Sequence, residues 1–167
     1  QTYIYTVRAK TILNGKTIWS GFDPKGLKAK ASIKTPVLKS AKAVAYNKIQ
    51  VTWEAVSGAT AYRVYRKTAG GGWKSVAYLG NSVSSFGDTG IVTGVSYTYT
   101  VRACRKINGK NYYGGYDKKG KSATASLSAG NLISTKTQSG KQTIEWKKIS
   151  GASGYQLQYA SSASAAF

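Results

Sequence analysis

Apolar and polar residues alternate with a period of two over much of this chain. Ile49, Val51 and Trp53 are separated by single polar residues, and residues 97–104 alternate in the same way. This is the pattern of half-buried strands. β-branched and aromatic residues dominate these stretches, and no stretch shows the periodicity of an amphipathic helix. The sequence therefore predicts an all-β protein.

Turn signals separate the predicted strands. Asn108-Gly109 lies between two strand-like stretches and is typical of a type I′ hairpin. Gly70-Gly71-Gly72 and Asn81 mark further turns. Several short strands joined by turns within about 90 residues predict an antiparallel β-sandwich.

The sequence also repeats itself. YTVRA at residues 5–9 returns at 99–103, and Asn14-Gly15-Lys16 returns as Asn108-Gly109-Lys110, so both pairs are 94 residues apart. Trp53 and its surroundings return at Trp146, 93 residues further on. A period of this length is too long for a solenoid repeat and suits a small independent domain.

The repeat predicts three segments. Residues 36–125 form one complete module, residues 1–34 match its C-terminal part, and residues 127–167 match its N-terminal part. We expect both chain ends to fall inside neighbouring modules of the same kind. Strand exchange between chains is a weaker alternative, because neither outer segment contains a counterpart of residues 76–94.

The complete module resembles a fibronectin type III domain, of the kind repeated along secreted and cell-surface proteins of Gram-positive bacteria. The likeness rests on Trp53, on GATAYRVYRK and on GVSYTYTVRA. It implies an immunoglobulin-like sandwich in tandem modules, an extracellular location, and a tyrosine at 97 that hydrogen-bonds back to the preceding loop. The structural core that it implies comprises Trp53, Tyr62, Tyr97, Val101, Trp146 and Tyr155.

The charge changes this picture more than any motif does. There are 25 Lys and Arg against five Asp and Glu, a formal net charge of +20, which favours polyanionic partners. A basic and aromatic stripe on the hairpin near Asn108-Gly109 is a candidate site for anionic cell-wall polymer or glycan. The alternative is a solubilising surface that protects strand edges, and the absence of a nucleic-acid-binding motif argues against nucleic acid. The candidate residues are Arg102, Arg105, Lys106, Lys110, Tyr113, Lys118, Lys119 and Lys121.

Catalysis and metal binding find little support. The chain has no histidine, which is the commonest general base, and its acids suggest no carboxylate pair. We expect no catalytic, cofactor or metal site. Cys104, the only cysteine, matches Lys10 in the first segment and is expected to be a solvent-facing thiol. No apolar run is long enough for a membrane span.

Three functions are compatible with these observations. The first is a non-catalytic spacer or adhesion region, which needs no special residues. The second is an electrostatic binding module for wall polymer or glycan. The third is an accessory region of a wall- or polysaccharide-degrading enzyme, for which family analogy is the only support.

Overall fold

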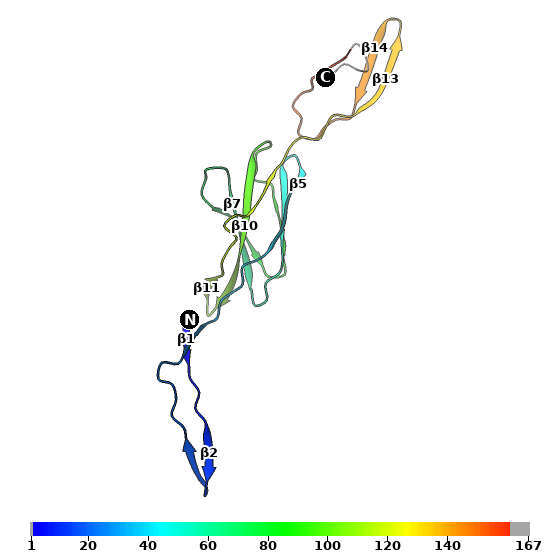
Figure 1. The fold of residues 1–167 in the computed structure, drawn as a ribbon. Coiled ribbons are helices and arrows are strands. Elements are labelled where there is room, and N and C mark those ends of the chain that lie inside the picture. The colour runs from blue at the N-terminus through cyan, green and yellow to red at the C-terminus, as the bar shows by residue number, and fades with distance from the viewer. Residues whose placement is uncertain (1, 161–167) are drawn as a thin grey trace.

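The computed structural model describes residues 2–160, and all regular elements of that part of the chain are strands. An N-terminal segment, a central sandwich and a C-terminal hairpin follow one another along an elongated molecule (Figure 1). Residues 161–167, which the sequence assigns to the third segment, lie outside the described residues. The prediction of an all-β antiparallel fold is confirmed.

The central module contains two sheets. The smaller sheet has the order β5-β6-β9, and both of its pairings are antiparallel. The larger sheet has the order β11-β10-β7-β8, and β12 pairs with the first part of β10. The strands of the smaller sheet are β5 (Leu38–Ala45), β6 (Lys48–Trp53) and β9 (Ser85–Asp88). Those of the larger sheet are β7 (Ala61–Lys67), β8 (Lys74–Gly80), β10 (Ser96–Ile107), β11 (Lys110–Tyr113) and β12 (Lys121–Thr124).

The chain moves repeatedly between the sheets. It leaves the smaller sheet after β6, forms β7 and β8, returns for β9, and crosses back to β10. The β10–β11 connection is the Asn108-Gly109 hairpin, in which both residues have a positive φ, 48° and 79°. This is the requirement of a type I′ turn, and asparagine and glycine tolerate it best.

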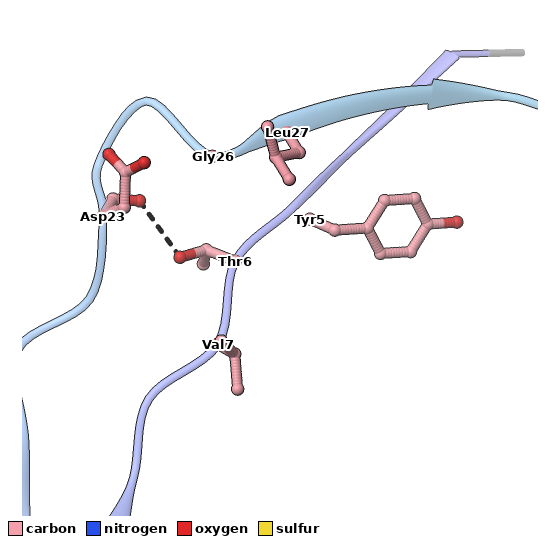
Figure 2. A pocket seen from close by; sticks show the side chains of 6 residues that line it. All are labelled: Tyr5, Thr6, Val7, Asp23, Gly26 and Leu27. Carbon is pink, nitrogen blue, oxygen red and sulfur yellow. Dashed lines mark hydrogen bonds between the residues drawn. The ribbon is translucent and has the colours of Figure 1, made fainter.

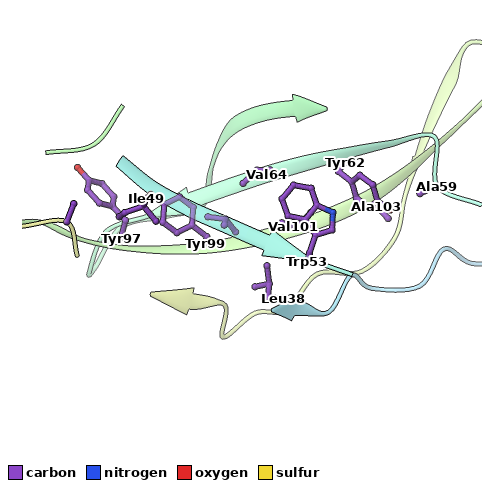
Figure 3. Packing of buried hydrophobic residues seen from close by; sticks show 12 residues of the cluster. Leu38, Ile49, Trp53, Ala59, Tyr62, Val64, Tyr97, Tyr99, Val101 and Ala103 are labelled. Atoms are coloured by element: carbon purple, nitrogen blue, oxygen red, sulfur yellow. The ribbon is translucent and has the colours of Figure 1, made fainter. Parts of the chain in front are cut away.

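The core lies between the two sheets (Figure 3). Ile49 and Val51 point inward from β6, and Val64 and Val101 point inward from the facing sheet, each at most 1% exposed. The Trp53 ring lies 5.5 Å from that of Tyr62, centroid to centroid. The apolar residues of the alternating stretches therefore form the inward side of each strand.

Two core tyrosines also accept hydrogen bonds from backbone amides in the loops between strands. The Tyr62 hydroxyl accepts a hydrogen bond from the Val56 N–H at 2.7 Å. The Tyr97 hydroxyl accepts one from the Val92 N–H at 3.1 Å. The second bond closes the loop before β10, as the sequence predicts, with the backbone amide as donor.

A buried carboxylate connects the sheets. Asp88 of β9 is 4% exposed, and its Oδ2 lies 2.8 Å from Arg66 Nη1 of β7. The Tyr99 hydroxyl of β10 donates to the same oxygen at 3.0 Å, and the Gly90 N–H donates to Oδ1 at 3.0 Å. A buried charge needs such partners to offset its lost hydration.

The outer segments repeat local parts of the module. β1 (Thr2–Tyr5) corresponds to the first four residues of β10 and β2 (Lys10–Leu13) to its last four, each 94 residues earlier in the chain. β3 (Lys16–Trp19) and β4 (Leu27–Lys30) correspond in the same way to β11 and β12. β13 (Leu132–Gln138) and β14 (Lys141–Trp146) form a hairpin, and β14 matches β6 shifted by 93 residues.

Two predicted core residues of the third segment are not buried. Trp146 and Tyr155 are 38% and 46% exposed. Their rings lie 5.4 Å apart, nearly as far as those of Trp53 and Tyr62, so the local pairing is the same. They stay accessible because no second sheet covers them within the described residues.

The expectation of a solvent-facing Cys104 is wrong. Its side chain is fully buried, although it lies on the outward side of β10. Its Sγ lies 3.8 Å from the hydroxyl of Tyr78, which projects from β8. Long aromatic and basic side chains cover this outer face, so outward does not mean solvated here.

We predict that Trp53→Ala lowers the free energy of unfolding by roughly 3–5 kcal/mol, because truncating a buried aromatic leaves a cavity. Urea unfolding followed by circular dichroism measures this loss. A change below about 1 kcal/mol would contradict a core centred on Trp53.

Tyr99→Phe should cost about 1–3 kcal/mol near neutral pH, because Asp88 loses a buried donor. Burial, followed by the Asp88 charge, raises the pKa of Tyr99 above its ordinary value of 10.0. The native state therefore holds this proton more tightly than the unfolded chain does. The contribution of this raised pKa to the free energy of unfolding is fully present below about pH 10 and is lost progressively as the pH rises above that value. Urea titrations at about pH 8 and pH 11 should show a steeper alkaline loss in wild type than in Tyr99→Phe, and equal slopes would contradict the assignment.

Candidate functional site

The N-terminal segment contains a pocket of about 310 Å³ between the end of β1 and the start of β4 (Figure 2). Its walls include Tyr5 and Val7, which are 58% and 86% exposed. Their counterparts 94 residues later, Tyr99 and Val101, are core residues with at most 1% exposure. The pocket therefore lies on the side of this segment that corresponds to the inward side of the central module, and no second sheet covers it within the described residues.

A different feature distinguishes the outer face of the larger sheet. Cationic and aromatic side chains contact one another in a continuous series across it, drawn from β7, β8, β10 and β11 and from the loops beside them. We call this series the cation–aromatic ladder. In spatial order its members are Lys67, Trp73, Tyr116, Arg102, Tyr113, Arg63 and Tyr78.

The centre of the ladder brings two arginines together. Arg63 of β7 and Arg102 of β10 are directly opposite in the strand register, where like charges repel. The Tyr113 ring centroid lies 5.3 Å from each guanidinium carbon, so one ring contacts both cations. Tyr78 and Tyr116 complete the series at 5.5 Å from Arg63 and Arg102, respectively. Cation–π attraction of this kind contributes about 0.5–1 kcal/mol per contact at exposed positions.

Arg102 forms part of a small pocket in the ladder. Its Nε donates to the Gly114 carbonyl at 3.0 Å, which fixes the plane of the guanidinium. The pocket, of about 110 Å³, is lined by Arg102, Tyr65, Trp73, Thr100 and Tyr116. A flat aromatic wall beside a fixed cation is suited to an anionic group attached to a ring.

The positive charge of this face is not neutralised by carboxylates. Within residues 2–160 the ion pair between Arg66 and Asp88 is the only one within 4.0 Å, and it lies in the interior. The neighbours of the Arg63 and Arg102 guanidiniums are therefore ring faces and, for Arg102, the Gly114 carbonyl, rather than carboxylates. A surface of this kind attracts anions by its summed field.

The N-terminal segment repeats the centre of the ladder. The Arg8 guanidinium carbon lies 4.3 Å from the Trp19 ring centroid, and Lys10 Nζ lies 5.9 Å from it. Arg8 and Trp19 are the 94-residue counterparts of Arg102 and Tyr113. The arginine–aromatic pair thus occurs in both copies of this hairpin.

The strand register divides the predicted stripe between the two sides of the sheet. Arg102 and Lys106 share the outer side with Tyr113, because each lies two residues along β10 from Cys104, which is opposite Tyr113 in the register. Arg105 and Lys110 leave their strands on the other side, and Arg105 Nη1 donates to the Gly58 carbonyl at 3.3 Å.

The remaining predicted lysines lie near the edge of the sheet. Lys121 is opposite Tyr99, a core residue, so it belongs to the inward side of β12. Lys118 and Lys119 are exposed in the turn before β12, where the Lys119 N–H donates to Asp117 Oδ1 at 2.9 Å. The eight residues therefore do not form a single stripe.

The sequence places Tyr116 beside the basic hairpin, but sequence reasoning missed Arg63, Lys67, Trp73 and Tyr78 as members of the ladder. A signal for two of them was present, because Arg63 and Lys67 lie on the same outward side of β7 as Tyr65. Trp73 and Tyr116 lie in loops, where no alternation indicates which way a side chain points. Their rings meet edge-to-face at 6.4 Å across the sheet.

Other kinds of site find no support in the described residues. Residues 2–160 contain no cluster of three or more His, Cys, Asp or Glu side chains that could hold a metal ion. The same part of the chain has no helix with the length and apolar character that a membrane crossing requires.

No protein-family model and no curated protein matches the sequence. Solved structures do resemble the chain. An Fn3-like protein from Clostridium thermocellum is 28% identical over 56% of this chain and 94% of its own, with a TM-score of 0.45. The fn3 domain of human collagen α-1(XX) is 18% identical over 57% of this chain and 90% of its own, with a TM-score of 0.37. A β-1,2-glucanase from Parabacteroides distasonis is 22% identical over 70% of this chain but only 16% of its own, with a TM-score of 0.48.

The two sheets themselves define the architecture. Three strands, β5-β6-β9, face a larger sheet built on β10 and β7, and aromatic residues from both fill the space between them. Tyr97 closes the loop before β10 in the manner of a tyrosine corner. The complete module has the fold of an immunoglobulin-like β-sandwich of the fibronectin type III kind.

Proposed function

We propose that the chain is a non-catalytic spacer or adhesion region of a secreted or cell-surface bacterial protein, built from tandem modules. Residues 1–34 and 127–167 then belong to the modules on either side of residues 36–125. The observation that carries this proposal is the recurrence of strand bounds, turns and ring pairs at a spacing of 93–94 residues.

The composition supports a non-catalytic role. All 167 residues contain no histidine and only five acids. The one buried acid, Asp88, is engaged by Arg66 and Tyr99 in a contact between sheets. A general acid or base needs a titratable group that a substrate can reach, whereas Asp88 is 4% exposed and lies between the sheets.

Antibodies against residues 36–125 test the proposed location. We expect them to label intact cells of the source organism or to detect the protein in the culture medium, with little increase after permeabilisation. An antibody against a cytoplasmic protein provides the control. Labelling that requires permeabilisation would contradict the proposal.

A second candidate function is the binding of anionic wall polymer or glycan by the outer face of the larger sheet. The specific observation in its favour is the cation–aromatic ladder, whose arginines have no carboxylate partner. The Arg8–Trp19 pair places the same chemistry in the preceding segment. Repeated weak sites along an array would bind a polymer through avidity.

Charge reversal tests the second candidate. Lys67→Glu with Lys106→Glu should weaken binding to a purified anionic wall polymer about tenfold, equivalent to about 1.4 kcal/mol, at low salt. Lys39→Glu with Lys42→Glu, on β5 of the other sheet, makes the same change in net charge and is the matched control. Equal losses in both variants would mean that net charge, and not this face, attracts the polymer. Binding that is unchanged at high salt would contradict an electrostatic mechanism.

A further inference from the structure

The turn between β5 and β6 lies at the end of the central module that faces the C-terminal hairpin (Figure 1). Tyr46 is at this turn, and its carbonyl accepts a hydrogen bond from Thr93 Oγ1 at 2.8 Å. The backbone of the turn is thereby tied to the loop before β10. The Tyr46 side chain is half-buried although it does not belong to the core of the module.

What covers Tyr46 is the backbone of the third segment at Gly151. A methyl group on Gly151 would lie 2.6 Å from Tyr46 Cε2 and 2.7 Å from Cγ, so the ring occupies the space of a side chain. A groove of about 510 Å³ runs beside this contact, between residues 43–47 and the serines at 126, 128 and 150. The tyrosine ring therefore packs against a bare glycine across the junction of two segments.

Gly58 occupies the same place in the central module. Gly58 and Gly151 have φ values of 77° and 86°. The loops around them share their hydrogen bonds, because the amides of Val56 and Ile149 each donate to a tyrosine hydroxyl at 2.7 Å. In the described residues the nearest atom to a methyl group at Gly58 is Arg105 Nη1, at 3.0 Å, at the end of a long side chain. Gly58 thus presents the same surface as Gly151 without a tyrosine on it.

We propose that this glycine loop is the docking surface for the β5–β6 turn of the preceding module, and that Tyr46 and Gly151 form such a joint. The partner at Gly58 would then be the corresponding turn of another module of the same kind. The joint rests on the proposed tandem arrangement and adds to it a defined orientation between successive modules. Two modules joined by a flexible linker alone would tumble independently.

The left-handed backbone alone would also select glycine at position 151, because other residues adopt such φ values with strain. The contact with Tyr46 must therefore be separated from the backbone requirement. Tyr46→Ala does this, since it removes the ring and leaves the φ of Gly151 and the Tyr46 carbonyl bond unchanged. Tyr112→Ala removes an exposed tyrosine on β11, far from the junction in sequence, and is the control.

Nuclear spin relaxation of backbone amides in the full chain measures the coupling. In wild type we expect residues 36–125 and residues 132–155 to share one rotational correlation time. Tyr46→Ala should lower the correlation time of residues 132–155 by about a third or more, and Tyr112→Ala should leave it unchanged. Separate correlation times in wild type, or no effect of Tyr46→Ala, would overturn the joint.

Two further readouts separate the joint from the tandem arrangement. Cross-strand contacts between β13 and β14, such as Thr135 to Ile144, report whether the hairpin forms. A formed hairpin that tumbles freely would overturn the joint and leave the tandem arrangement standing, whereas a hairpin that does not form would overturn the joint and count against both.

A substitution pair tests the steric part. Gly151→Ala and Gly58→Ala carry a similar backbone penalty, but only the first collides with Tyr46. Tyr46→Ala should therefore be strongly non-additive with Gly151→Ala and additive with Gly58→Ala in the correlation time of residues 132–155. Additive behaviour in both pairs would overturn the contact.

Discussion

The buried carboxylate of Asp88 is the constraint on which the sandwich depends most. Its position on β9 brings one strand of the smaller sheet against two strands of the larger one, through Arg66 and Tyr99. The carboxylate is the buried member of this ion pair, and the cost of burying its charge is offset only if every partner is in place. The hydrophobic core brings the sheets together, and this cluster restricts how they can slide past one another.

The alternation of apolar residues was sufficient to predict the sheet and its inward side. Trp53 and Tyr62 were recognisable as core because each lies on the apolar side of a strand whose apolar and polar residues alternate. The role of Asp88 could not be predicted, because it depends on Arg66 and Tyr99. These residues lie on β7 and β10 of the larger sheet and approach Asp88 only when the two sheets pack together. Sequence spacing carries no information about that meeting.

The candidate site was less predictable than the fold, for reasons that follow from strand geometry. Lys121 lies near the hairpin in sequence, but its register opposite Tyr99 places it on the inward side. Cys104 has an outward position, but Tyr78 reaches it from β8, which lies beyond β7 in the same sheet. The ladder depends on contacts across four strands, and only its Arg102–Tyr113 step could be inferred from one hairpin. The same step recurs as Arg8–Trp19, so a comparison of the two copies of the hairpin could have predicted that this arginine and this aromatic residue lie together.

The single cysteine gives the module a mechanical property. With Cys104 alone, no disulfide can lock residues 36–125 internally. Under tension a module of this kind can unravel from end to end, and a chain of this length reaches roughly 300 Å when fully extended. In the tandem array that we propose, the chain would lengthen under tension by yielding one module at a time. Each module could refold when the force falls, because no covalent bond has been broken.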